Sequence, residues 1–98
     1  MHDAATPMTP KIEHRPERGR FQTTVDGLPG VIDYRLADGV MHITHTEVAP
    51  PLEGRGVAPA LVDAALAHAR ANGLKVSPVC GYVRAYMRRH PSTQDLLA

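Results

Sequence analysis

The first half of the chain alternates apolar and polar positions with a period of about two residues, which is typical of β-strands that are exposed on one face. Two Asp-Gly pairs, Asp26-Gly27 and Asp38-Gly39, interrupt this alternation. Such pairs favour tight hairpins because glycine adopts a positive φ without strain. The pattern predicts a meander of three or four antiparallel strands, over residues 21–25, 31–36 and 40–48, with 11–14 as a candidate edge strand.

The second half changes to the period of an amphipathic helix. Its apolar stripe consists of Ala58, Leu61, Val62, Ala65, Leu66 and Ala69. This stripe predicts a helix over residues 57–72, and Gly73 is placed to end it as a C′ glycine. A strand over 74–80 and a shorter helix over 82–90, stopped by Pro91, follow, and Ser92 is placed to cap a last turn.

These elements together indicate an α+β fold with a mixed sheet. The strand at 40–48, the helix at 57–72 and the strand at 74–80 form one βαβ unit, whose strands should be parallel and whose crossover should be right-handed. The antiparallel meander is therefore extended by one parallel strand beside two main helices. Residues 1–10 are expected to be a disordered tail, and residues 11–98 a single small domain.

Composition narrows the function classes. A formal net charge of +1 argues against a dedicated nucleic-acid binder, which normally presents a strongly basic face. The single cysteine, Cys80, excludes an intrachain disulfide and a thiolate-rich metal site, and we expect no metal. The first residues show no apolar targeting segment and no stretch approaches a membrane span, so a cytoplasmic location is expected.

The segment that joins the strand at 40–48 to the following helix carries the clearest chemical signal. Backbone N–H groups at a helix start have no partner inside the helix, and the helix dipole favours an anion there. The predicted donors are the amides of Gly54, Arg55, Gly56, Val57 and Ala58, and the Arg55 guanidinium adds charge. This set suits a pyrophosphate. The alternative is a glycine turn that only caps the helix.

Several short stretches resemble the GNAT superfamily of N-acetyltransferases, and most closely its small stand-alone GNAT-like members. They are Gly19-Arg20-Phe21, Asp33-Tyr34-Arg35, His45-Thr46-Glu47-Val48, Gly54-Arg55-Gly56-Val57-Ala58, Lys75-Val76-x-Pro78-x-Cys80, Tyr82-Val83 and Arg89-His90-Pro91. The resemblance implies that the strand ending at Val48 and the strand ending at Cys80 splay apart. The pantetheine arm of acetyl-CoA would lie between them, with its pyrophosphate on the glycine loop, residues 54–58. Pro51 stands where the wider superfamily has Gln or Arg. The chain also lacks the N-terminal helices that build the acceptor site, so this pocket should be shallow or completed by a partner.

Four residues are candidates for acetyl transfer, in the order Cys80, His45, Tyr86 and Glu47. Cys80 precedes a helix N-terminus, where a thiolate is stabilised, and an acetyl-Cys80 intermediate would make the reaction ping-pong. Tyr86 falls about where enzymes of the wider superfamily carry a tyrosine that protonates the CoA sulfur. The alternatives are an inert buried Cys80 and a Tyr86 that serves only the core.

His45 and Glu47 alternate with Thr46 along one strand, so both should face the same side of the sheet, beside the diverging strands. There His45 is a candidate base, with Glu47 orienting or replacing it. His42, an odd number of residues away, should face the opposite side. The alternative is that His45 and Glu47 belong to a solvated polar face.

Three arginines of the last predicted helix, Arg84, Arg88 and Arg89, form a basic cluster. They are interpreted as a solvated face or as a contact with the 3′-phosphate of CoA.

Taken together, the motifs and the resemblance predict an acetyl-CoA-dependent N-acetyltransferase. The acceptor amine is unspecified: a polyamine, small amine, peptide and lysine all remain open. One alternative is a non-catalytic acyl-CoA-binding or sensing module that works with a protein partner, and another is a small interaction domain. No membrane or nucleic-acid partner is expected. The protein should be a monomer or a weak homodimer, since an edge strand at 11–14 would permit pairing between copies.

Overall fold

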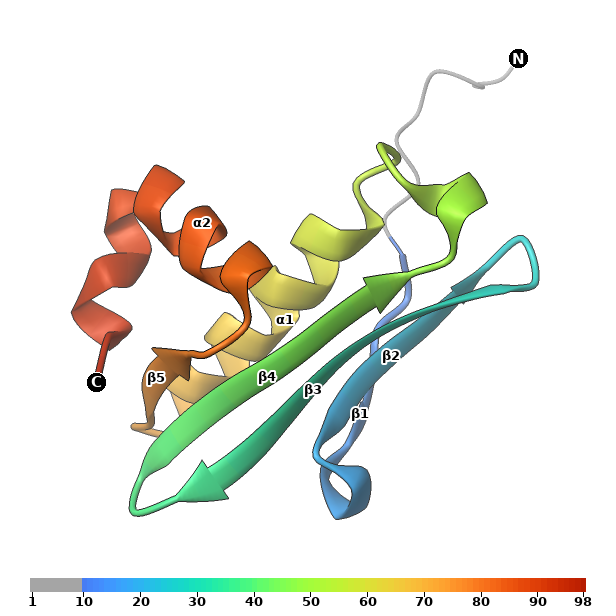
Figure 1. Ribbon diagram of the computed structural model, residues 1–98. Helices are drawn as coiled ribbons and strands as arrows, with labels where there is room; N and C mark the ends of the chain where they lie inside the picture. The colour runs from blue at the N-terminus through green and yellow to red at the C-terminus, as the bar shows by residue number, and fades with distance from the viewer. Residues whose placement is uncertain (1–9) are drawn as a thin grey trace.

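A computed structural model describes residues 10–98 and places one five-stranded sheet beside two helices (Figure 1). The strands lie side by side in chain order: β1 (Glu13–Arg15), β2 (Arg20–Val25), β3 (Leu28–Ala37), β4 (Val40–Val48) and β5 (Lys75–Pro78). The first four are antiparallel, and β5 pairs with β4 in parallel. The predicted mixed α+β fold is confirmed. The tail expected at 1–10 lies outside the described residues, except for Pro10.

The helices complete the order predicted from the sequence. They are α1 (Val57–Ala71) and α2 (Gly81–Arg89), with short 3₁₀ helices η1 (Pro16–Arg18), η2 (Pro50–Leu52) and η3 (Pro91–Leu96). The strand expected at 74–80 is shorter in the structure, because β5 ends at Pro78 and Cys80 already caps α2. In the described part of the chain, no helix has the length and apolar character needed to cross a membrane.

Both Asp-Gly pairs form the predicted hairpins. Asp26 and Gly27 have φ values of 54° and 76°, and Asp38 and Gly39 have values of 53° and 76°. Two successive positive φ angles match the right-handed twist of the flanking strands. The β2–β3 pairing continues as far as the turn, so β3 begins at Leu28, three residues earlier than expected.

Helix α1 packs across one face of the sheet, behind the strands in the view of Figure 1. The predicted stripe is buried from Leu61 to Ala69, whereas Ala58 at its start is half-buried. At the other end, the amides of Gly73 and Leu74 donate to the carbonyls of Arg70 and Ala69, as in a Schellman motif. The predicted C′ role of Gly73 is confirmed.

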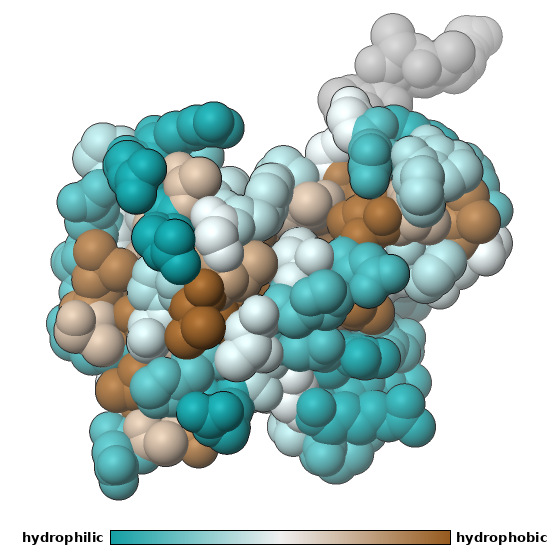
Figure 2. All heavy atoms as spheres, in the orientation of Figure 1, coloured by the Kyte–Doolittle hydropathy of each residue, from teal (hydrophilic) through white to brown (hydrophobic). Residues whose placement is uncertain are grey.

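The core is aliphatic and lies between this sheet face and the helices, with Ile32, Ile43 and Leu61 fully buried. The opposite face carries polar side chains, among them Arg20 and Asp33, which form an ion pair at 2.7 Å. Figure 2 shows hydrophilic residues over the strands and hydrophobic ones near α2 and where the chain leaves β4.

A β-bulge in β4 decides which side chains reach the helix-covered face. Ile43 pairs with Tyr34 and His45 pairs with Asp33, so Thr44 is one residue extra. Beyond Thr44 the alternation is inverted, and His42 and His45 both face the polar side of the sheet. The expectation that these two histidines point to opposite faces is therefore wrong, because it assumed an unbroken period of two.

Candidate functional site

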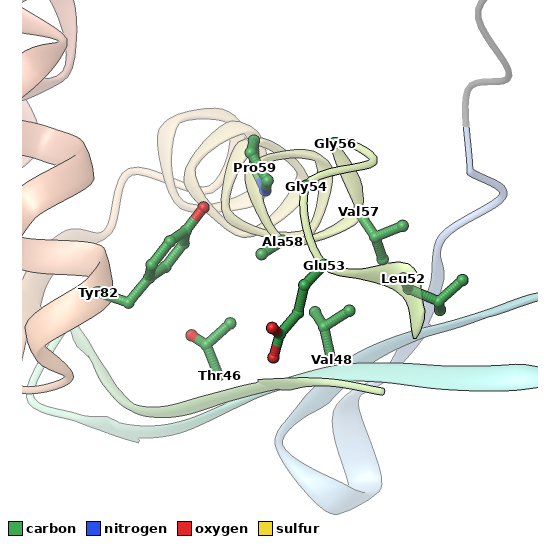
Figure 3. A pocket seen from close by; sticks show the side chains of 10 residues that line it. All are labelled: Thr46, Val48, Leu52, Glu53, Gly54, Gly56, Val57, Ala58, Pro59 and Tyr82. Carbon is green, nitrogen blue, oxygen red and sulfur yellow. The ribbon is translucent and has the colours of Figure 1, made fainter. Parts of the chain in front are cut away.

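A cavity of about 510 Å³ opens where β4 and β5 separate (Figure 3). Strand β5 ends at Pro78, opposite Ile43, whereas β4 continues to Val48, so the second half of β4 has no partner on that side. The loop before α1 and the first turn of α2 supply the other walls. The lining residues are Thr46, Val48, Leu52, Glu53, Gly54, Gly56, Val57, Ala58, Pro59 and Tyr82.

The glycine loop presents free backbone donors to this cavity. Gly54 and Gly56 have φ values of 80° and 83°, which other residues adopt only with strain. Among the residues that the structure describes, the amides of Gly54, Gly56, Val57 and Ala58 have no hydrogen-bond acceptor. The fifth predicted donor, the amide of Arg55, donates to the carbonyl of Leu52 at 3.2 Å. Four donors at a helix start make a site for an anion such as a phosphate.

The side chain of Arg55 points away from the cavity. Its guanidinium pairs with Asp26 in the β2–β3 turn, with Nη1 and Oδ2 3.1 Å apart. Both side chains are about half exposed, so this ion pair is weak and the guanidinium is free to exchange partners. Arg55 thus lies in the predicted phosphate-binding loop, but its guanidinium is directed toward Asp26 and away from the cavity.

Cys80 lies just before α2 and next to Thr46 of the cavity wall. Its sulfur is 3.6 Å from Thr46 Oγ1, and its backbone amide donates to the Ile43 carbonyl at 2.9 Å. Burial by itself would raise the pKa of the thiol. The backbone amides of Val83 and Tyr82 at the start of α2, together with Thr46, outweigh burial and lower the pKa below its usual value.

His45 and Glu47 face the polar side of the sheet, away from the cavity. They contact each other, with Nε2 and Oε1 3.0 Å apart, and both side chains are more than half exposed. The bulge at Thr44 causes this placement, and Thr46 and Val48 line the cavity instead. The structure therefore does not bring His45 and Glu47 together with Cys80.

Tyr86 borders a second hollow of about 420 Å³ between the start of α1 and α2. Its hydroxyl donates to Asp63 Oδ1 at 3.1 Å, and its ring stacks on His90. Burial and the Asp63 carboxylate raise the pKa of Tyr86, so the phenol keeps its proton at neutral pH. Pro59 and Tyr82 line both hollows, which therefore adjoin each other.

Sequence reasoning missed five of the residues that line the cavity: Thr46, Leu52, Glu53, Pro59 and Tyr82. Figure 3 shows the Glu53 carboxylate directed toward β4, and the Tyr82 ring standing across the cavity from Val48. Tyr82 belongs to a stretch that carries the family resemblance, but no role was predicted for it from the sequence. Thr46 could have been found only by knowing of the bulge.

The three arginines of α2 have different surroundings, although all are exposed. Arg84 donates to the Val79 carbonyl at 3.0 Å. Arg84 and Arg88 both border a hollow beside β5 and η3, whereas Arg89 borders the second hollow beside Tyr86. The basic cluster predicted from the sequence is thus divided over different surfaces.

Comparisons with known proteins agree with this geometry. A family model described as GCN5-related N-acetyl-transferase matches residues 20–96. Protein NATD1 from Mus musculus is 30% identical, over 88% of this chain and 81% of the relative, and the Homo sapiens protein is 30% identical over 88% and 79%. The solution structure of a GCN5-like protein of Staphylococcus aureus, to which N-acetyltransferase activity has been ascribed, superposes with a TM-score of 0.73 at 30% identity, over 92% of this chain and 89% of that one. The chain belongs to the GCN5-related N-acetyltransferase family.

Proposed function

We propose that this protein takes an acetyl group from acetyl-CoA onto Cys80 and passes it to an amine. Family membership supports a role in acetyl transfer. The finer proposal rests on the two ends of one cavity. Unpaired amides lie at one end, and Cys80, whose pKa is lowered, lies near the other end beside the wall residue Thr46.

The glycine loop would hold the pyrophosphate of acetyl-CoA. The four free amides and the positive end of α1 favour this doubly anionic group. Between the loop and Cys80, the cavity wall is largely apolar, with Val48, Leu52 and Tyr82 contributing. An apolar wall suits the uncharged pantetheine arm, which would carry the thioester toward the start of α2.

Transfer through Cys80 takes two displacement steps. The Cys80 thiolate attacks the thioester carbonyl, an S–C bond forms, and the bond from that carbon to the CoA sulfur breaks, which releases CoA thiolate. An amine then attacks acetyl-Cys80, loses a proton and regenerates the thiol. Tyr86, which keeps its proton at neutral pH, is the candidate acid for the CoA sulfur. The geometry argues against His45 and Glu47, which face the other side of the sheet, and in favour of Cys80, which contacts the cavity residue Thr46.

The first part of the test is calorimetric titration of acetyl-CoA and of CoA. We expect micromolar binding, about −8 kcal/mol, and loss of this binding in Gly56→Asp, which puts a carboxylate beside the free amides. Gly39→Asp is the matched control, because both glycines have a positive φ and open space around the missing Cβ. Absence of binding to the folded protein, or an equal loss in both variants, would reject the loop as the phosphate site.

The second part follows the acetyl group by intact mass after incubation with acetyl-CoA. We expect one acetyl group on the protein, none on Cys80→Ala, and release of the group when a primary amine is added. A protein that binds acetyl-CoA and remains unacetylated would contradict transfer through Cys80. That result would favour the alternative of an acyl-CoA-binding module that works with a partner.

A further inference from the structure

We propose that Thr46 is a positioning residue for Cys80: its hydroxyl holds the sulfur at the cavity wall and stabilises it in its reactive, ionised form. The inference rests on the proposed role of Cys80 in acetyl transfer. It assigns a function to a residue that the family resemblance itself left without one.

The β-bulge brings Thr46 to this place. With an unbroken alternation from Ile43, His45 would face the cavity and Thr46 the polar side. The extra residue at Thr44 inverts the alternation, so Thr46 pairs with the fully buried Ile32 and shares its face. There Thr46 lines the cavity and its Oγ1 lies 3.6 Å from the Cys80 sulfur. One side chain therefore joins the cavity to the thiol.

A hydroxyl suits both protonation states of the thiol. The neutral S–H donates to Thr46 Oγ1, as the structure has it. After ionisation the hydroxyl rotates and donates its own proton to the sulfur, which a methyl group cannot do. Hydrogen bonds to the charged form of a group favour that form.

The surroundings of Cys80 supply dipoles. Of the charged side chains nearby, Arg84 is directed elsewhere, and Glu53, whose carboxylate enters the cavity beside Thr46 (Figure 3), is an anion and does not favour a thiolate. The amides of Val83 and Tyr82 favour the thiolate from α2, and Thr46 favours it from β4. The Arg84 guanidinium donates to the Val79 carbonyl. The phenol of Tyr82, which opens onto the cavity, has a pKa that burial raises and Arg89 partly lowers, so it is neutral when Cys80 ionises. If the Thr46 hydroxyl is removed, no cation among the described groups that act on the thiol compensates for its loss.

The test is the pH dependence of alkylation by iodoacetamide, without acetyl-CoA. Cys80 is the single cysteine, so the rate reports on one thiol. We expect Thr46→Val to shift the profile to higher pH and to slow alkylation at neutral pH by roughly three- to tenfold. Thr46→Ser should restore the wild-type profile. Thr24→Val, which makes the same change on an exposed position of β2, should leave it unmoved.

Two results would overturn the inference: a Thr46→Val profile that coincides with the wild type, or a Thr46→Ser profile that stays shifted. Urea unfolding midpoints establish that each variant is folded, and Thr46→Ala replaces the valine variant if that one does not fold. Acetylation of Cys80 together with an unmoved profile would reject the role of Thr46 alone. A shifted profile without acetylation would keep the role of Thr46 and reject the transfer step.

Discussion

At the scale of single residues, three arginines of one helix differ in what surrounds them, although their side chains are identical. Arg84 and Arg88 border one hollow near β5, and Arg84 also donates to the Val79 carbonyl. Arg89 alone of the three borders the hollow that shares Pro59 and Tyr82 with the main cavity. If the nucleotide end of CoA extends from the glycine loop toward this hollow, Arg89 is the one of the three arginines that can contact its 3′-phosphate.

Arg89→Gln should therefore weaken acetyl-CoA binding while leaving acetyl-dephospho-CoA, which lacks the 3′-phosphate, unaffected. We expect a loss of roughly three- to tenfold, as for one charge-assisted contact at an exposed site. Calorimetric titration with both compounds measures the difference. Arg88→Gln removes the same charge from the same helix and should change neither affinity. An equal loss with both compounds in Arg89→Gln would mean that the arginine does not read this phosphate.

At the scale of elements, the glycine loop depends on how closely α1 approaches β3. Gly30 of β3 lies under the first turns of α1, where an added Cβ would be 3.0 Å from Val57 Cγ1 and 3.3 Å from Leu61 Cδ1. Both contacts are shorter than ordinary van der Waals distance. The absence of a side chain at Gly30 thus sets the position of α1, and with it the position of the free amides at its start.

Gly30→Val should lower the free energy of unfolding by about 1–3 kcal/mol, because it overpacks the contact between sheet and helix. Urea denaturation measures this change. Gly81→Ala is the control, since Gly81 has an ordinary φ and open space around the missing Cβ at the start of α2. It should leave stability unchanged or slightly raised. If Gly30→Val were as stable as the wild type, α1 would have to move without cost.

At the scale of the whole molecule, one aromatic cluster joins the edge strand to the rest of the fold. His14 of β1 stacks on Phe21 of β2, hydrogen-bonds the Tyr34 hydroxyl of β3, and meets the edge of the His68 ring of α1. Burial, and then repulsion from His68, lower the pKa of His14, although Glu17 partly opposes them. The folded protein therefore favours neutral His14, and protonation favours loss of these contacts.

Stability should consequently fall as the pH drops below about 6.5, the value for a free histidine, and the loss should grow until the lowered folded pKa is passed. Urea unfolding at about pH 7.5 and at about pH 5.5 measures this difference. His14→Phe should reduce it, whereas His42→Gln on the polar face should not. Asp95, whose pKa is lowered by its hydrogen bond to Arg70, loses its contribution only below about pH 4 and does not interfere. A pH dependence that His14→Phe leaves intact would place the sensitive group elsewhere.

The sequence by itself determined the elements and their order, because the signals for these are local. Asp26-Gly27 and Asp38-Gly39 specified hairpins through backbone conformations that few other residues adopt. The stripe from Leu61 to Ala69 specified the buried face of α1, and a strand–helix–strand succession admitted essentially one handedness. The glycine loop was predicted for the same reason, because Gly54 and Gly56 adopt a positive φ, which is a local property of the backbone at each glycine.

Only the tertiary structure decided which side chains meet at the cavity. The bulge at Thr44 depends on how two strands pair across a sheet, and it has no signature in one strand's own residues. Because of this bulge, Thr46 lines the cavity wall in place of His45. The partners of Arg55 and Tyr86, Asp26 and Asp63, lie more than twenty residues away in the chain. Such contacts follow from packing between elements, whereas periodicity and turn residues report only on the conformation within each one.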